Sequence, residues 1–173
     1  MPYSAGENSA DVIAFVEQNN IASVLDIGPG SGTYGKLLRS SVARIDAIEI
    51  WEPYVKEFEL RKIYDTVIID DFRHWPDYAI TGRKWDLIVF GDVLEHMSAA
   101  ESQRVWTHAS YLAKFGLISV PIIHYPQGAE FGNPHEVHVQ EHLHPEEIKR
   151  DYGPFVFEKE YNVTGTYIKD FKA

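Results

Sequence analysis

Short apolar runs alternate with polar segments of helical length along most of the chain. Runs of Val, Leu, Ile and Phe are typical of buried parallel strands, and the segments between them carry helical apolar spacing or capping signals. The runs that predict strands are 21–27, 43–50, 67–69, 85–90 and 116–120. Helices are expected at 9–19, 33–40, 53–62, 98–114 and 145–151, with a short or irregular one at 75–81.

Two aromatic-rich runs close the chain. They cover 155–161 and 166–171, and the sequence NVTG between them is typical of a hairpin turn. Two helix starts are also marked: Ser9 is expected to cap the first helix, and Ser98 with Glu101 has capping-box spacing. The pattern predicts an α/β fold in which five strand–helix units precede an antiparallel pair.

The first predicted strand runs directly into a glycine-rich turn, VLDIGPGSGTYG at 24–35. Gly28, Gly30 and Gly32 permit a tight turn because they lack a Cβ. The helix that follows would direct its unpaired amide groups and the positive end of its dipole at a ligand. This order of strand, glycine turn and helix predicts a nucleotide site.

Acidic residues mark the ends of the next strands. Glu49 closes the second strand, Asp70 and Asp71 follow the third, and the sequence GDVLEHM at 91–97 follows the fourth. The segment 122–144 has five histidines, two prolines, two glycines and no sustained apolar period. Long loops in compact domains are usually functional or mobile, so this segment is expected to form a lid over a substrate.

Composition narrows the class of protein. The 173 residues with 45% hydrophobic content predict one domain spanning 1–173. No membrane span or signal sequence is evident, and cysteine is absent, so a cytoplasmic, non-membrane protein is expected. A net charge of −10 makes a nucleic-acid partner unlikely and favours a small-molecule or protein substrate, of which a small-molecule acceptor is the one expected. The oligomeric state is not indicated.

The chain resembles the class I S-adenosylmethionine-dependent methyltransferases over nearly its full length. The resemblance is carried by VLDIGPGSGTYG, by Glu49, by Asp71 with Phe72, and by FGDVLEHM at 90–97. It implies a doubly wound, seven-stranded Rossmann-like sheet with strand seven antiparallel between strands five and six. It also implies S-adenosyl-L-methionine as cofactor and S-adenosyl-L-homocysteine as product.

The resemblance also implies roles for individual residues. Asp26 would organise the methionine end of the cofactor, and Glu49, 17 residues past Gly32, would take both ribose hydroxyls. Asp71 would accept from the adenine amino group, and Phe72 would supply a backbone donor and an apolar wall. The complete set expected to bind cofactor is Asp26, Gly28, Gly30, Gly32, Tyr34, Glu49, Ile50, Asp71, Phe72, Gly91 and Asp92.

The acceptor side is expected at the ends of strands four and five. Methyl transfer is a direct displacement, so the protein mainly aligns the acceptor and excludes water. His96 is the candidate base for a hydroxyl acceptor, with Glu95 beside it, because an imidazole titrates near the operating pH. A structural role for this Glu-His pair is the alternative. The predicted reaction is methyl transfer to an oxygen or nitrogen nucleophile of a small molecule.

Three other functions stay open. The sequence at 30–35 also satisfies GxGxxG with Glu49 downstream, as in nicotinamide-binding Rossmann proteins, although the chain is short for one. The turn Asp92-x-x-Glu95-His96 with a later histidine is similar to the small-RNA 2′-O-methyltransferases that hold Mg²⁺. A catalytically inactive cofactor-binding module is the third.

No metal ligand is assigned from the sequence, because Mg²⁺ sites seldom use several imidazoles. The segment 136–148 is also similar to the histidine-rich run that precedes the last helix in sugar-type methyltransferases.

Overall fold

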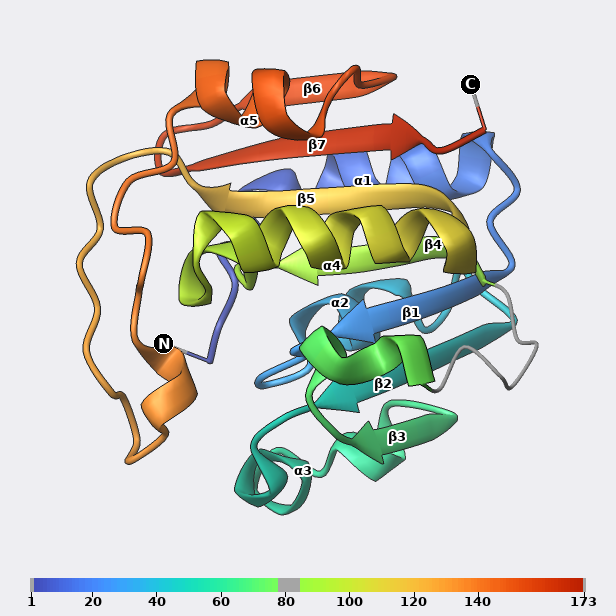
Figure 1. Ribbon diagram of the computed structural model, residues 1–173. Helices are drawn as coiled ribbons and strands as arrows, with labels where there is room; N and C mark the ends of the chain where they lie inside the picture. The colour runs from blue at the N-terminus through green and yellow to red at the C-terminus, as the bar shows by residue number, and fades with distance from the viewer. Residues whose placement is uncertain (1, 78–84, 173) are drawn as a thin grey trace.

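A seven-stranded mixed sheet forms the centre of the molecule. The computed structural model describes residues 2–77 and 85–172. The strands follow the order β3-β2-β1-β4-β5-β7-β6, in which the first five are parallel and β7 is antiparallel to both β5 and β6 (Figure 1). Their bounds are β1 Ser23–Ile27, β2 Arg44–Glu49, β3 Thr66–Ile69, β4 Trp85–Gly91, β5 Ala113–Pro121, β6 Phe157–Glu160 and β7 Thr164–Asp170. The predicted doubly wound sheet and its antiparallel strand are confirmed.

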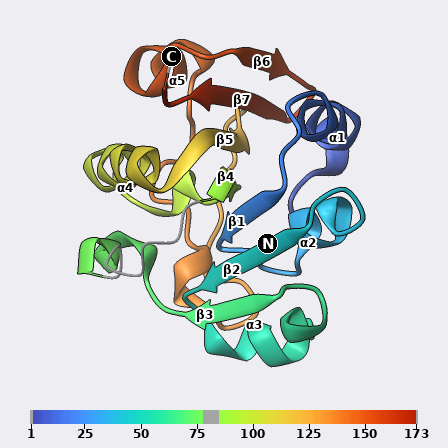
Figure 2. The same cartoon turned by 90° about the vertical axis from the view of Figure 1, so that its right-hand side faces the viewer.

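Helices cover both faces of this sheet. Figure 2 shows α4 on one face and α1 and α2 on the other. The α-helices are α1 Ser9–Gln18, α2 Thr33–Leu38, α3 Glu52–Glu57, α4 Ala99–Leu112 and α5 Pro145–Tyr152. Short 3₁₀ turns are η1 Gly6–Asn8, η2 Leu60–Lys62, η3 Phe72–Asp77, η5 Leu94–His96 and η6 Pro134–Glu136. No helix among the described residues has the length and apolar character needed to cross a membrane.

Alternate residues of the central strands enter two separate cores. Ile88 and Phe90 of β4 belong to the core beneath α4, and Leu87 and Val89 belong to the core beneath α1 and α2. All four side chains are fully buried. A strand buried on both faces is apolar, which explains the unbroken apolar run at 87–90; Asp86, before it, is half-buried and accepts from the amides of Ala22 and Ser23.

The capping box predicted for the longest helix is present. Ser98 Oγ accepts from the Glu101 amide, and the Glu101 carboxylate accepts from the Ser98 amide. The predicted end of this helix at Lys114 is wrong, as is the predicted start of the next strand at Gly116. The backbone becomes extended at Ala113, which pairs with Trp85 at the first position of the β4–β5 ladder.

The predicted cap of the first helix is wrong, although the helix begins at Ser9 as expected. Asn8, not Ser9, is the N-cap, and its side chain points into the protein instead of capping the helix. The side-chain Nδ2 of Asn8 donates to Tyr34 Oη and to Thr166 Oγ1, both at 2.8 Å. Ser9 Oγ instead donates to the Gly6 carbonyl in the preceding turn.

The helix predicted over 53–62 is interrupted. It ends at Glu57, and Glu59 adopts a left-handed conformation with φ of 51° before the η2 turn begins. The reversal brings Leu60 into a fully buried position beneath the sheet. Burial of this leucine overrides the helix propensity of the segment.

Two further predicted elements differ in extent. Phe72–Asp77 forms a 3₁₀ turn where a helix was expected at 75–81, and the rest of that prediction lies outside the described residues. In the closing hairpin, the residues Thr164 and Gly165 of NVTG belong to β7. The reason is that the Glu7 carboxylate accepts from the amides of Val163 and Thr164 and fixes the start of the strand.

Candidate active site

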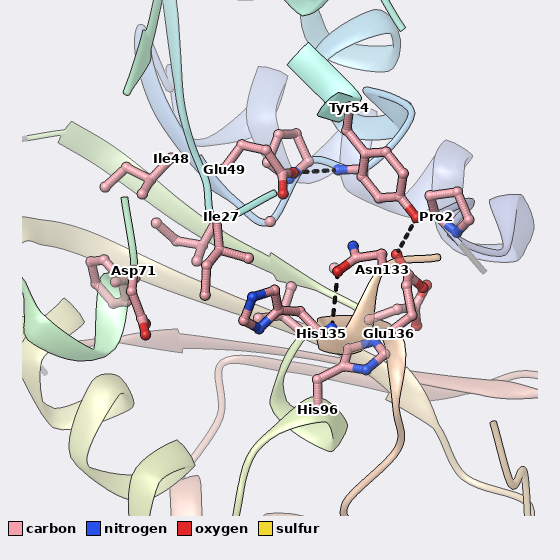
Figure 3. A pocket seen from close by; sticks show the side chains of 18 of the residues that line it. Pro2, Ile27, Ile48, Glu49, Tyr54, Asp71, His96, Asn133, His135 and Glu136 are labelled. Atoms are coloured by element: carbon pink, nitrogen blue, oxygen red, sulfur yellow. Dashed lines mark hydrogen bonds between the residues drawn. The ribbon is translucent and has the colours of Figure 1, made fainter. Parts of the chain in front are cut away.

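A cleft lies at the carboxyl ends of β1, β2 and β4. It contains about 850 Å³ of space free of protein atoms, open solvent at its mouth included. Figure 3 shows the side chains around it. The structure brings nine of the residues predicted from sequence into its lining: Gly28, Gly30, Glu49, Ile50, Asp71, Phe72, Gly91, Asp92 and His96. Ligands of open α/β sheets bind at such strand ends.

One side of the cleft, here called the strand wall, consists of Gly28, Gly30, Glu49 and Gly91 at the ends of the three strands. Gly28 and Gly30 have φ of 61° and 52°, values that favour glycine. A Cβ at Gly91 would collide with the ring of Tyr34. A Cβ at Gly28 would likewise meet Val93, so these glycines let the chain pack closely around the turn.

The N-terminal segment covers the glycine turn. The Pro2 carbonyl accepts from the Ser31 amide at 2.8 Å, and a Cβ at Gly30 would lie 2.6 Å from that carbonyl oxygen. Pro2, Tyr3 and Ser4 all line the cleft. The sequence carried no pattern that could assign this segment to the site.

Glu49 occupies the centre of the strand wall. One carboxylate oxygen accepts from the Trp51 amide at 2.8 Å and the other from the Gly30 amide at 3.3 Å. Each oxygen retains a second lone pair for a ligand. Burial raises the pKa of Glu49 to about 7, since the carboxylate loses hydration.

Asp71 is held by a neighbouring arginine. The Arg73 guanidinium donates three hydrogen bonds of 2.7 to 3.0 Å to the two Asp71 oxygens. Although burial opposes the effect, these bonds lower the pKa of Asp71. Asp71 is therefore oriented by Arg73 at the rim of the cleft beside Phe72.

Asp92 has an unusual backbone conformation and an unpaired oxygen. Its φ is 55°, and its amide donates to the Ser119 carbonyl at 2.7 Å, which fixes the turn after β4. The buried Oδ1 atom has no hydrogen-bond partner among the described residues. Burial raises the pKa of Asp92 to about 7. An orphaned carboxylate oxygen in a cleft fits a ligand that carries a cationic or N–H donor.

Four predicted residues do not line the cleft: Asp26, Gly32, Tyr34 and Glu95. The first three lie behind the glycine turn. Asp26 accepts from Tyr64 Oη at 2.6 Å, and burial raises the pKa of Asp26 to about 7. A Cβ at Gly32 would meet Ile63 and Leu60. Asp26, Gly32 and Tyr34 are therefore placed to support the glycine turn from behind.

The opposite side of the cleft, here called the loop wall, consists of Asn133, His135 and Glu136 from the long loop. Tyr54 Oη donates to a Glu136 oxygen at 3.1 Å, which joins α3 to the loop (Figure 3). The ring of His135 contacts that of Trp51 at a centroid distance of 6.1 Å. Part of the segment 122–144 therefore lines the cleft, while its role as a lid stays a prediction; no sequence signal singled out Tyr54, Asn133 or Glu136.

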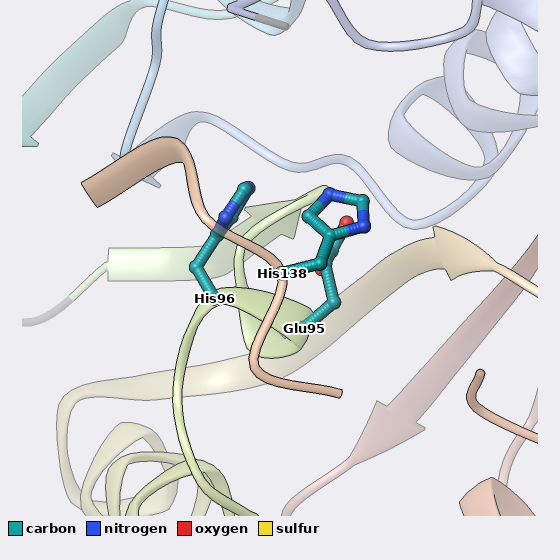
Figure 4. Close-up of side chains that lie close together, drawn as sticks. All are labelled: Glu95, His96 and His138. Carbon is teal, nitrogen blue, oxygen red and sulfur yellow. The ribbon is translucent and has the colours of Figure 1, made fainter. Parts of the chain in front are cut away.

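Beside this wall, Glu95, His96 and His138 lie together, and of these three only His96 lines the cleft (Figure 4). One potential ligand atom of each lies within 4.8 Å of the others. Both oxygens of the buried Glu95 lack a hydrogen-bond partner among the described residues. The sequence singled out Glu95 and His96 but could not select His138 from five loop histidines.

In both histidines of this cluster, Nδ1 lies at hydrogen-bond distance from a backbone carbonyl. His96 Nδ1 lies 3.2 Å from the Val137 carbonyl, and His138 Nδ1 lies 2.6 Å from the Tyr125 carbonyl. A carbonyl only accepts, so both Nδ1 atoms carry the proton and both Nε2 lone pairs are available. Burial lowers the pKa of His96 to about 4 and also lowers that of His138, so both rings are neutral at pH 7.

Gln140 fastens the loop to the turn that carries Glu95 and His96. Its side-chain amide donates to the Leu94 carbonyl at 3.0 Å and to the Met97 carbonyl at 2.9 Å. The amides of Val139 and Gln140 both donate to the Glu95 carbonyl. These bonds fix the position of His138 relative to Glu95 and His96.

Comparison with solved structures identifies the fold. A methyltransferase from Clostridium acetobutylicum, described as S-adenosylmethionine-dependent, superimposes with a TM-score of 0.69 and 12% identity, over 92% of this chain and 89% of that one. The N-terminal domain of EvdMO1 with S-adenosylhomocysteine bound gives 0.67 and 14%, over 95% and 80%. The methyltransferase domain of bacterial CtHen1 gives 0.67 and 15%, over 94% and 97%.

No protein-family model matches the chain, and no curated protein sequence matches it. The three superpositions show that the chain has the fold of the class I S-adenosylmethionine-dependent methyltransferases. Their sequence identities of 12 to 15% establish the fold alone.

Proposed function

We propose that the protein is an S-adenosylmethionine-dependent methyltransferase acting on an oxygen or nitrogen nucleophile of a small molecule. The observation that carries this proposal is the strand wall, where Glu49 presents free lone pairs beside Gly28 and Gly30. Bound S-adenosylmethionine supplies an electrophilic methyl group on a sulfonium. The EvdMO1 domain has also been crystallised in the presence of S-adenosylhomocysteine and D-fucose, which supports a small-molecule acceptor.

The residues of the strand wall would hold the cofactor. Glu49 would accept from the ribose hydroxyls, and the neighbouring residues Ile50, Asp71 and Phe72 would border the adenine. Asp92, which follows Gly91, would accept from the cationic amino group of the methionine end through its orphaned Oδ1. Asp26, Gly32 and Tyr34 support the glycine turn from behind.

His96 would receive the acceptor's proton. Its ring lines the cleft, and the carbonyl of Val137 holds the proton on Nδ1, which leaves Nε2 as the basic atom. With S-adenosylmethionine bound, the acceptor heteroatom would take the methyl carbon while the electron pair of the carbon–sulfur bond stayed with sulfur, and Nε2 of His96 would take the acceptor's proton. A neutral imidazole of low pKa is a weak base but is ready to accept at pH 7.

The test is transfer of a labelled methyl group from S-adenosylmethionine to a panel of hydroxyl and amine compounds, with binding of S-adenosylhomocysteine measured by calorimetry. We expect S-adenosylhomocysteine to bind and label to appear in at least one acceptor. Binding without transfer would instead identify an inactive cofactor-binding module. Binding of NAD in place of S-adenosylhomocysteine would identify a nicotinamide-binding protein.

The cluster of Glu95, His96 and His138 favours a second candidate function, methyl transfer assisted by a divalent metal. Metal-bound histidines almost always donate their second ring N–H to a carbonyl or carboxylate, as both histidines do here. The unpartnered Glu95 oxygens would complete an N/O ligand set that suits a transition metal. Activity that survives chelation, with no metal bound to the purified protein, would contradict this candidate.

A further inference from the structure

Two consecutive aspartates, Asp70 and Asp71, follow β3 and line the cleft. The Asp70 amide donates to the Glu49 carbonyl at 3.0 Å, so this pair begins directly beside the strand wall. The resemblance to the class I methyltransferases implies that Asp71 accepts from the adenine amino group. That role requires a carboxylate oxygen that can still accept a hydrogen bond.

The carboxylate of Asp71 is already occupied by one neighbour. Its Oδ1 accepts from the amide and from the Nε of Arg73, both at 2.9 Å. Its Oδ2 accepts from Nη2 of Arg73 at 2.7 Å and from Nε at 3.0 Å. His74 Nδ1 lies 3.8 Å from the same Oδ2. A carboxylate has about four acceptor sites, so an adenine amino group could bind Asp71 only in competition with Arg73.

Arg73 is itself held from a second side. Its Nη1 lies 3.5 Å from a Glu101 oxygen, and Glu101 belongs to the capping box at the start of α4. The guanidinium thus joins Asp71 to α4, and a forked contact between arginine and carboxylate is among the stronger hydrogen-bonded pairs in proteins. Rotation of Asp71 toward a ligand would break this contact. The geometry therefore suits Asp71 to hold the η3 turn in place.

Asp70 has the free oxygen that Asp71 lacks. Its Oδ1 accepts from the Asp71 amide at 2.7 Å, which orients the side chain. Within the described part of the chain, no group donates to its Oδ2. Because Asp70 is partly exposed and lines the cleft, this second oxygen can accept from a ligand that reaches the end of β3.

We propose that Asp70, not Asp71, accepts from the adenine amino group of the cofactor and makes the site specific for a 6-aminopurine. Asp71 is a positioning residue that holds Arg73 and the η3 turn. The inference rests on the proposed methyltransferase function and names the residue that distinguishes the base. A carboxylate accepts from a 6-amino group and repels a 6-oxo group, so the site should reject a cofactor that carries hypoxanthine.

The test compares two ligands by calorimetric titration of the full chain. They are S-adenosylhomocysteine and S-inosylhomocysteine, in which a 6-oxo group replaces the amino group. The wild type should bind S-inosylhomocysteine about 30-fold more weakly, the size expected for one hydrogen bond to a charged group. Equal affinities of the wild type for the two ligands would overturn the proposal.

A pair of variants then identifies the residue. In Asp70→Asn the side-chain oxygen can still accept from the Asp71 amide, while an NH₂ donor replaces Oδ2. The two affinities should therefore come within about threefold of each other. Asp71→Asn makes the same change one residue along. It should weaken both ligands to the same extent, because it loosens the contact with Arg73, and it should keep the preference of the wild type.

Two results with the variants would contradict the proposal. One is retention of the wild-type preference in Asp70→Asn, and the other is loss of that preference in Asp71→Asn. Binding of neither ligand to the wild type would refute the proposed methyltransferase function and, with it, this inference. Tight binding of both ligands would leave that function standing and refute only the role of Asp70.

Discussion

The two walls of the cleft are built in different ways. The strand wall is formed by residues at the ends of paired strands, where Ile27 and Ile48 are register partners and Gly28 and Glu49 follow them directly. The loop wall comes from a segment of irregular backbone and depends on side-chain bonds from Tyr54, Gln127 and Gln140. The comparison indicates that paired strands fix the strand wall, whereas a few polar side chains fix the loop wall.

The largest expected effect is on the strand wall. Glu49→Ala should weaken S-adenosylhomocysteine binding by about 100-fold, since two hydrogen bonds to a carboxylate together contribute about 3 kcal/mol. Calorimetric titration measures the change. Glu52→Ala, at an exposed position three residues along, is the matched control and should bind as the wild type does. Equal affinities in the two variants would remove Glu49 from the cofactor site.

The strand wall also predicts a pH dependence of stability. The pKa of Glu49 lies at about 7 in the folded protein against 4.5 ordinarily, so the folded state binds more protons between these values. Stability of the ligand-free protein should then fall as pH rises from about 5 to 8, by up to about 3 kcal/mol per such carboxyl. In Glu49→Gln the free energy of unfolding, measured with denaturant, should decrease less over this pH range than in the wild type. An equal decrease in the two proteins would contradict the prediction.

The position of the loop wall should depend on Gln140, which bonds the loop to the turn after β4. Gln140→Ala removes the bonds to the carbonyls of Leu94 and Met97, so it should lower methyl transfer about tenfold and leave S-adenosylhomocysteine affinity within about threefold. Labelled-methyl assays and calorimetry separate the two effects. Gln18→Ala, exposed on α1, serves as control. A parallel loss of cofactor affinity would show that the two walls are not independent.

A smaller effect is expected where α3 meets the loop. Tyr54→Phe keeps the ring and removes only the hydroxyl that donates to Glu136. Loss of one hydrogen bond of about 1 kcal/mol should raise the KM for acceptor about fivefold, with kcat nearly unchanged. An unaltered KM would mean that this bond does not position the loop wall.

The same contrast explains what could be predicted from the sequence. The strands and the glycine turn follow from the apolar runs and from the glycines after the first of them, whereas the order of the sheet and the expected places of Glu49 and Asp92 in the site follow from the resemblance to the class I methyltransferases, whose motifs lie at strand ends. These signals are local, so a single sequence carries them. The break at Glu59 and the early start of β5 at Ala113 depend on tertiary packing and pairing, and so they could not be predicted locally.

The loop wall was predictable only as a region. A segment without a hydrophobic period gives no indication of which of its residues face the rest of the protein. Nothing in the sequence could therefore select His138 from the loop histidines or place Glu136 beside Tyr54. Pro2 and Tyr3 were missed for the same reason, because their contact with the glycine turn is long-range. The residues of the loop wall are thus the ones that the sequence indicates least.

The most direct test of the account is calorimetric titration of the wild-type chain with S-adenosylhomocysteine and, separately, with NAD. The account predicts saturable one-to-one binding of S-adenosylhomocysteine that Glu49→Ala abolishes or greatly weakens, and no detectable binding of NAD. Binding of NAD without binding of S-adenosylhomocysteine would contradict the assignment of the cleft.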